Sequence, residues 1–447
     1  MASHSFESLV RNAVDRIAST LNGLSNGPLH AHRRAALEAF ATTGVPTPRS
    51  EEWKYTNVAP FIGLEYGTVP SADESVTASA IREVFAPLGE VLEGGWHAVI
   101  VDGVFRPSLS CLPSAEAGVE CSVISDASAA DVANFSELFG TLAPAESSPF
   151  AAVNTAVTSG GLLIRLRAGA QVTRPLHVAV VTTVQTEHRL SCPRIMVVAG
   201  ENSSADIIES HHSIGPNTAL DVTVTEVHGA PSSHIRYYKL VDDGVAIRHI
   251  GYTGASVYRG GTFTAHSVNL GGAFVRNNLA VKLLEPSAEA FLYGVSSLGG
   301  QEYADNHTVV DHIAPHCHSE ELYKGVYDGT SIGVFNGKIY VRPQAQKTTA
   351  YQSSRAILLS ERAQMNAKPQ LEIWADDVKC SHGATTGQLD EEALFYMRSR
   401  GLDEANAKAF LTYAFLADVA QHINLSSLRE YVEQRLAAKI GFTLFAE

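Results

Sequence analysis

The sequence predicts a mainly β protein in which a long run of short strands lies between two helical ends. Between residues 162 and 382 there is almost no helical periodicity, and short apolar runs follow one another at even spacing. Several runs alternate strictly, as Leu279, Val281 and Leu283 do, and glycine pairs such as Gly260–Gly261 separate them. Such strands are typical of a sandwich, a barrel, a propeller or a β-helix. Without a clear residue-level repeat, all four architectures stay open.

The apolar runs give the individual strands. The predicted strands are Leu162–Leu166, His177–Val181, Arg194–Val198, Leu220–Val224, Ile235–Leu240, Thr262–Leu270, Leu279–Leu283, Ala290–Tyr293, Ile332–Phe335 and Ile339–Val341. The last two flank Asn336–Gly337, a dipeptide typical of tight turns, so a strand–turn–strand is expected there.

Helical periodicity marks the N-terminal segment. Phe6–Leu21 shows one apolar face, and a second helix is expected over Leu29–Thr43, where Gly44 ends it. Trp53 in the following loop is expected to pack beneath this domain. Further on, Trp96–Phe105 predicts a hairpin around Asp102–Gly103. Two short helices are expected, at Ala129–Phe139 and at Pro149–Thr158.

The period becomes helical again after Gly387. Acidic residues begin one helix at Asp390, Asp403 can cap a second, and Ser427–Glu430 is a capping box for a third. The chain therefore divides into an N-terminal helical and mixed domain (1–160), a β-rich core (161–388) and a C-terminal helical module (389–447).

Composition excludes some classes of function. The 447-residue chain has 33 basic and 47 acidic residues, a net charge of −14, which argues against nucleic-acid binding. The N-terminus lacks the apolar segment of a signal peptide, and no apolar run approaches the roughly 18 residues of a membrane span. The five cysteines are scattered, which suits reduced thiols in the cytoplasm.

The stretch from Lys368 to Gly387 carries the most distinctive chemistry. Val378, Cys380 and His382 are spaced by two, so in an extended strand their side chains share one face. Thiol and imidazole groups suit iron, zinc and sulfide chemistry. The pair alone lacks the second set of ligands of a zinc site, and a packed thiol beside a hydrogen-bonded histidine is the alternative interpretation.

Other clusters have weaker signals. His312, His316, Cys317 and His318 are the densest set of potential ligands, but Pro315 places them in a loop, and stacked turn residues are the expected role. His211–His212 beside Glu209 is a weaker candidate still. Paired carboxylates of a β-helix polysaccharide lyase or hydrolase could come from the set Asp305, Asp311 and Glu320.

A segment that superficially matches a phosphate-binding loop runs from Gly333 to Lys338. It has one residue too few between its glycines, and Ile339 stands where Ser or Thr should bind magnesium. The chain therefore shows no machinery for ATP hydrolysis, and a partner must supply any ATPase activity.

Long runs at fixed order and spacing resemble the SufB/SufD family of the SUF iron–sulfur cluster assembly system, and its SufD members in particular. The runs are Lys368–Ile373, Ala375–Thr385, Gln388–Gly401, Asp305, His307, His312, Pro315–Gly325, Phe335–Val341, Ala345–Thr348 and Gly44–Thr56.

This resemblance implies a right-handed parallel β-helix core and the role of a non-catalytic scaffold subunit. It implies a SufB-like paralogue at the last rungs and a SufC-like ATPase on the C-terminal helices. A transient iron–sulfur cluster would form at the heterodimer interface, with His382 as a ligand and Cys380 as the adjacent thiol. No cofactor is expected to stay bound to the isolated chain, which could pair with itself through its open edge.

Overall fold

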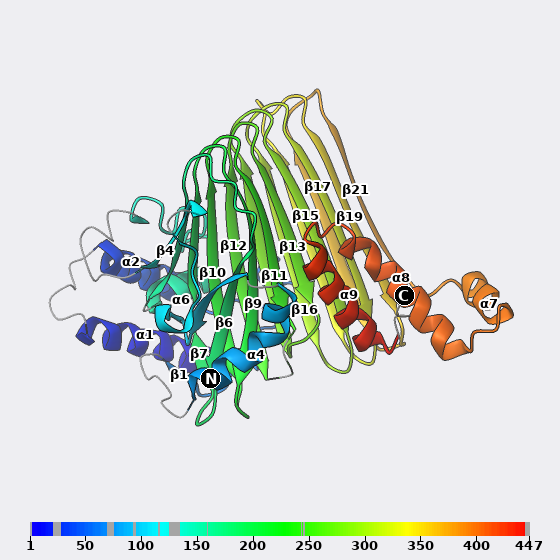
Figure 1. The fold of residues 1–447 in the computed structure, drawn as a ribbon, viewed down its shortest axis with the longest axis horizontal. Helices are drawn as coiled ribbons and strands as arrows, with labels where there is room; N and C mark the ends of the chain where they lie inside the picture. Colours follow the sequence, from blue (N-terminus) through cyan, green and yellow to red (C-terminus); the bar gives the residue numbers. More distant parts are fainter. Residues whose placement is uncertain are drawn as a thin grey trace.

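The core of the molecule is a parallel β-solenoid, seen in the computed structural model of Figure 1. The structure describes residues 2–20, 28–68, 76–92, 95–114, 117–124, 135–158, 160–242, 244 and 246–442. From β9 onward, successive strands alternate between two sheets, so each turn of the solenoid adds one strand to each sheet. The predicted β-helix is thereby confirmed.

The first sheet, called sheet A, runs from β4 to β20. In spatial order its strands are β4 (Val119–Ile124), β5 (Gly161–Leu166), β8 (Arg194–Ala199), β10 (Ala219–Gly229), β12 (Ile247–Val257), β14 (Phe274–Leu283), β16 (Tyr303–His312), β18 (Ile332–Val341) and β20 (Gln364–Ile373). The short strands β1 (Gly67–Thr68) and β7 (Arg189–Ser191) pair beside β10.

The second sheet, sheet B, runs from β3 to β21. Its strands are β3 (Val104–Phe105), β2 (Trp96–Val101), β6 (Leu176–Thr183), β9 (Ser204–Ile214), β11 (His234–Val241), β13 (Thr262–Asn269), β15 (Glu289–Leu298), β17 (His318–Tyr327), β19 (Thr349–Leu358) and β21 (Lys379–Gly387). Both sheets are parallel except at their beginning, where β4 pairs with β5 and β2 with β3 in antiparallel fashion.

Alternation along each strand builds the interior of the solenoid. Leu279, Val281 and Leu283 on β14 point inward and join a buried apolar cluster to which both sheets contribute. In a parallel ladder, equivalent positions of successive turns stack on one another, so one apolar position on a strand covers the next. The low content of charged residues, 18%, fits a chain with so much buried surface.

Helices cover the outer faces of both sheets. On sheet A lie α1 (Ala2–Thr20), α2 (Pro28–Thr43), α3 (Ala59–Ile62) and α6 (Pro149–Val157), whose apolar residues share a cluster with β10, β12 and β14. On sheet B lie α4 (Ala78–Val91), α8 (Glu404–Ala420) and α9 (Ser426–Ile440). Helix α7 (Glu391–Ser399) projects from the body at the far end (Figure 1).

Most local predictions for the N-terminal segment are confirmed. Gly44 ends α2 with a positive φ of 64°, and Asp102 and Gly103 form the predicted hairpin turn, both with positive φ. Trp53 is buried against Phe150 of α6, as expected. The helix predicted over Ala129–Phe139 lies largely outside the described residues.

The strand–turn–strand expected at Asn336–Gly337 is wrong. Both residues lie inside the single strand β18, paired with His307 and Thr308 on one side and with Lys368 and Pro369 on the other. Ladder partners on both sides override the local turn preference. Gly337 is needed here for space, since a Cβ atom would lie 2.4 Å from the Gln352 side chain.

In the described part of the chain, none of the helices combines the length and the apolar character that crossing a membrane requires.

Candidate functional site

The solenoid ends in two unpaired edges. Strand β20 is the last of sheet A and pairs only with β18, and β21 is the last of sheet B and pairs only with β19. None of the nine residues of β21 is buried, whereas all eight residues of β6, near the other end, are. A row of free backbone N–H and C=O groups is therefore open to another chain.

Cys380 and His382 lie on this last rung, where the sequence placed them. In the ladder, Cys380 pairs with Ala350, and His382 pairs with Gln352. Cys380 and Val378 are partly buried and pack against the interior cluster, while the His382 side chain is exposed. Since residues two apart on a strand share a face, the thiol and the imidazole are neighbours at the mouth of the solenoid.

The surroundings of Cys380 disfavour the thiolate form. Partial burial raises the pKa of the Cys380 thiol, and the backbone N–H of Ala350 offsets this only in part. The neighbouring Lys379 belongs to the opposite face of the strand by alternation. A metal ion or a partner must therefore remove the thiol proton before this sulfur can act as a ligand.

Behind His382 the interior of the solenoid is polar. Gln352 and then Glu321 precede His382 in the same ladder column, and both are buried. The Glu321 carboxyl group accepts hydrogen bonds from the Thr308 hydroxyl group (2.5 Å) and the Gln352 amide (3.1 Å). Burial raises the pKa of Glu321 to about 7. Glu321 and Gln352 were not predicted from the sequence, because they are about thirty residues apart and only the ladder register brings them together.

Apolar side chains are exposed around this end. Trp374 is 49% exposed, Tyr351 42%, Ile373 40% and Leu359 39%. The Trp374 ring stacks on Tyr340, and the Arg342 guanidinium group lies near both rings. Aromatic residues and arginine grouped in this way are typical of the centre of a protein–protein interface.

The N-terminal segment reaches the same end through a loop on sheet A. Glu51 pairs with Lys368 on β20, and Glu52 pairs with Lys338 on β18. The Arg276 guanidinium group stacks 3.7 Å from the centre of the Trp53 ring. These contacts connect the N-terminal helices to strands β14 to β20 of the solenoid.

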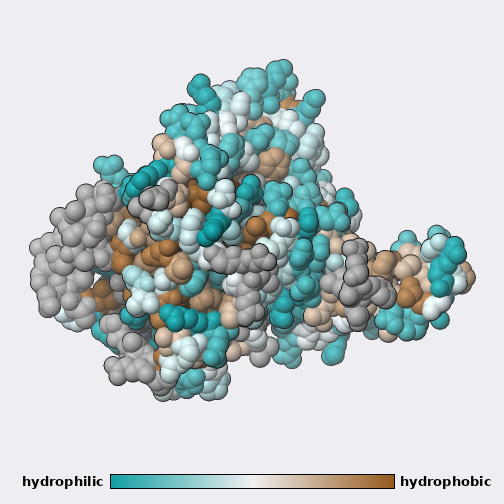
Figure 2. Space-filling view, in the orientation of Figure 1, coloured by the Kyte–Doolittle hydropathy of each residue, from teal (hydrophilic) through white to brown (hydrophobic). Residues whose placement is uncertain are grey.

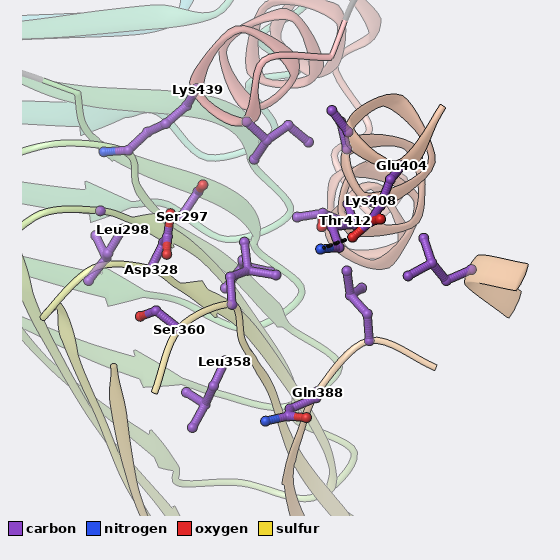
Figure 3. A pocket seen from close by; sticks show the side chains of 18 of the residues that line it. Ser297, Leu298, Asp328, Leu358, Ser360, Gln388, Glu404, Lys408, Thr412 and Lys439 are labelled. Carbon is purple, nitrogen blue, oxygen red and sulfur yellow. Dashed lines mark ion pairs between the residues drawn. The ribbon is translucent and has the colours of Figure 1, made fainter. Parts of the chain in front are cut away.

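Helix α7 and the start of α8 form a lobe that projects from the body, whereas the rest of α8 and α9 pack on sheet B (Figure 1). Helix α7 has no buried residue, and Phe395 is 74% and Tyr396 55% exposed. Figure 2 shows hydrophobic atoms on the surface of this projecting lobe. A groove of about 770 Å³ separates the lobe from the rim of the solenoid (Figure 3). Lys408 of α8 pairs there with Glu404 rather than with the solenoid.

The dense cluster at residues 312–318 lies only partly in a turn, because His312 is the last residue of β16 and His318 the first of β17. His316 lies in a turn with a positive φ of 60°. The buried His312 ring hydrogen-bonds the Ser319 hydroxyl group (2.8 Å), and Cys317 is buried in the interior cluster. Among the described residues, no three of these side chains bring their ligand atoms close enough to share a metal ion.

The three carboxylates considered for polysaccharide cleavage do not converge either. Asp305 is buried on sheet A and pairs with Arg276, and Asp311 pairs with Arg342. Glu320 alternates with the inward-facing Ser319 and Glu321 on sheet B, so it faces outward on the opposite side of the solenoid. The arrangement does not favour the hydrolytic alternative.

Comparison with known families accounts for nearly the whole chain. The family model described as the SUF system FeS cluster assembly, SufBD core domain matches residues 181–415. The model described as the SufBD protein N-terminal region matches residues 6–178.

Individual relatives are similar over most of their length. The chain is 28% identical to the iron–sulfur cluster assembly protein SufD of Escherichia coli, over 90% of this chain and 91% of that protein. It is 26% identical to an iron–sulfur cluster assembly SufBD family protein of Synechocystis, over 94% and 93%. It is also 26% identical to the chloroplastic protein ABCI7 of Arabidopsis thaliana, over 91% and 85%.

Proposed function

The chain belongs to the SufB/SufD family of SUF-system iron–sulfur cluster assembly proteins, and from this premise we propose that it is a non-catalytic scaffold subunit of a SufB–SufC–SufD type complex. The observation that carries the proposal is the open last rung, where Cys380 and His382 lie beside unpaired strands and exposed aromatic residues. Such an edge suits pairing with a homologous solenoid.

The nascent cluster, which is the cargo of this complex, forms in our proposal where the last rungs of this chain and a SufB-like paralogue meet. His382 supplies an imidazole nitrogen, which can bind iron and still exchange when the finished cluster leaves. Cys380 is the second candidate ligand, once a metal or the partner has displaced its proton. The isolated chain holds no finished cluster, because half of the site belongs to the paralogue.

The C-terminal module is the proposed docking site for a SufC-like ATPase. The exposed Phe395 and Tyr396 of α7 offer an unpartnered apolar surface for it. The groove between α8 and the solenoid rim leaves room for the lobe to move when the ATPase changes its conformation. Free, unbridged cysteines fit a complex that works in the cytoplasm. The division of the chain at residues 160 and 388 stays a prediction.

The test is anaerobic cluster reconstitution of the co-expressed three-subunit complex, comparing wild type with His382→Ala. We expect the variant complex to assemble and to lose most of its cluster yield. His234→Ala is the matched control, because His234 is also an exposed histidine on sheet B but lies at the start of β11, far from the last rung. An intact complex with an unchanged cluster yield would reject the role of His382.

A further inference from the structure

A second group of potential ligands lies inside the solenoid, away from the open end. His211 of β9, Asp221 of β10 and His249 of β12 are buried, and one potential ligand atom from each lies within 4.8 Å of the others. The two imidazole rings are 4.2 Å apart, and Asp221 and His249 are direct partners in the ladder. Five strand spacings of about 4.8 Å separate β10 from β20, so this group is distinct from Cys380 and His382.

The hydrogen bonds around His211 orient one of its nitrogens toward this group. His211 Nε2 lies 2.8 Å from Glu209 Oε1, and His211 Nδ1 lies 3.4 Å from Asp221 Oδ2. Carboxylates only accept hydrogen bonds, so without an ion Nε2–H donates to Glu209 and Nδ1–H donates to Asp221. An ion that displaces the Nδ1 proton would lie between Nδ1 and Asp221. An imidazole held by a carboxylate on one nitrogen and free to ligate with the other is the usual arrangement at protein metal sites.

The carboxylates are also held in place. Glu209 accepts hydrogen bonds from Thr225 (2.7 Å) and Tyr237 (2.5 Å), and its carboxylate lies 3.2 Å from the Lys239 ammonium group. Asp221 accepts a hydrogen bond from the Thr182 hydroxyl group (2.6 Å) through Oδ1, so Oδ2 faces His211. The ligand set is thus preorganised by surrounding groups that would not themselves touch an ion.

His249 is the residue of this group whose polar atoms the protein leaves unsatisfied. Its side chain is completely buried, yet neither ring nitrogen makes a hydrogen bond of normal geometry. A buried polar atom without a partner costs about 1–3 kcal/mol, and such atoms often mark a missing ligand or ion. A Cβ atom at Gly251 would lie 2.6 Å from His249 Nε2 and 2.8 Å from Lys239 Nζ, so glycine leaves room for the ring and the ammonium group side by side.

Charge favours a cation at this place. With neutral imidazoles, the two carboxylates, Glu209 and Asp221, outnumber the single ammonium group of Lys239. A buried excess of negative charge must be compensated by a proton or by a metal ion. Two imidazoles and one carboxylate suit borderline divalent ions such as Zn²⁺ or Fe²⁺.

From these observations we propose that His211, Asp221 and His249 bind a divalent transition-metal ion inside the solenoid. With metal–ligand bonds of about 2.0–2.2 Å, the three side chains close on the ion and tie β9, β10 and β12 together. The ion is a structural component of the isolated chain. It therefore departs from the expectation that this chain alone retains no cofactor. Because the site is sealed, the ion enters during folding.

The test uses the full chain, produced in medium supplemented with zinc and then dialysed against a mild chelator. We expect about one Zn²⁺ per chain by elemental analysis, and Co²⁺-grown protein to show the visible absorption of nitrogen- and oxygen-ligated Co²⁺. His249→Gln should lower metal retention by at least about 100-fold. If that variant does not fold, Asp221→Asn, which keeps the shape of the side chain, replaces it.

Two control variants show whether the ion is held by these three residues or elsewhere in the chain. His266→Gln changes an equally buried histidine that stacks between Tyr238 and Tyr293, and it should retain the ion. The double variant Cys380→Ala/His382→Ala should also retain it, which distinguishes this proposal from the assembly site. Wild-type protein that retains no metal, or equal retention by wild type and His249→Gln, would overturn the proposal.

Discussion

The two ends of the solenoid have the same ladder of parallel strands, but the strands near each end differ in how far they are buried. At the N-terminal end of the solenoid, the antiparallel strands β3 and β4 are the outermost strands of the two sheets. Every residue of the nearby strand β6 is buried. At the other end, no residue of β20 or β21 is buried, although both strands pair normally with their inner neighbours. Pairing with one neighbouring strand is therefore not enough to bury the residues of a rung; another segment must also lie on its outer edge. Among the described residues, no strand pairs with the outer edge of the last rung.

Two buried carboxylates differ in their partners, Glu226 on the outer face of sheet A beneath Gly140 and Leu142, and Glu321 inside the solenoid. Burial alone would raise the pKa of Glu226, but the Arg194 guanidinium group and the backbone N–H groups of Gly140 and Leu142 lower it. Glu321, near the open end, has hydroxyl and amide partners only, and burial raises its pKa to about 7. Glu226 is thus buried with a counter-charge, as Asp305 is with Arg276, whereas Glu321 has no counter-charge and titrates near neutral pH.

The largest expected effect comes from a pair of tryptophans, one in each region. Trp53→Ala removes a side chain that is 5% exposed, packed on Phe150 and stacked under Arg276, and should lower the free energy of unfolding by about 3–5 kcal/mol. Trp374→Ala removes a ring that is 49% exposed and should cost less than about 1 kcal/mol. Chemical denaturation of the isolated chain measures both, and equal losses would remove the contrast between the regions.

Next in size is the pH dependence that Glu321 contributes. The folded chain keeps this proton up to about pH 7, whereas the unfolded chain loses it near the ordinary value of 4.5. Between these values the folded state binds more protons, so stability falls as pH rises, by up to about 3 kcal/mol from this group. Glu321→Gln cannot ionise and should gain stability relative to wild type as pH rises from about 5 to about 8.

The matched variant for this measurement is Glu226→Gln at the early rungs. Because the pKa of Glu226 is lowered, its contribution is present above the ordinary pKa and is lost on acidification, so the sign is opposite. This variant also leaves Arg194 buried without its charge partner and should be destabilised at neutral pH. If the difference in the free energy of unfolding between wild type and Glu321→Gln were the same at about pH 5 and about pH 8, Glu321 would not titrate between these values.

A smaller effect, about 2 kcal/mol, is expected for association rather than folding. Trp374→Glu places a charge among the exposed aromatic residues of the last rung and should weaken binding to the SufB-like paralogue roughly 30-fold. Arg342 and Tyr340 lose their stacked neighbour, but the solenoid stays folded. Calorimetric titration checks the affinity, and Phe395→Glu on α7 serves as the control that should leave paralogue binding unchanged.

The weakest expected effect is pairing of the chain with itself. The open edge of β21 should allow a dimer at high concentration, less stable than the heterodimer because two identical edges are not matched in their side chains. Light scattering over a concentration series would show the dimer, and Trp374→Glu should abolish it. A chain that stays monomeric at the highest concentration would count against self-pairing.

Sequence patterns were sufficient to predict the run of strands, the helical ends and the place of Cys380 and His382 on a strand at an edge of the β-rich core. These features depend on neighbouring residues, such as the alternation of Leu279, Val281 and Leu283. The sequence could not predict the partners of Glu321 or the cluster around His249, because a solenoid brings together residues about thirty positions apart. The turn predicted at Asn336–Gly337 was wrong for the same reason, since the ladder partners of these two residues lie a full turn of the solenoid away in each direction.

Hydrogen exchange, measured segment by segment on the chain alone and in the three-subunit complex, tests the role of the open end most directly. We expect residues 379–387 of β21 to exchange rapidly in the isolated chain and to become strongly protected in the complex, while β6 stays protected in both. Unchanged exchange over β21, with new protection only elsewhere on the solenoid, would contradict the assignment of the last rung as the pairing surface.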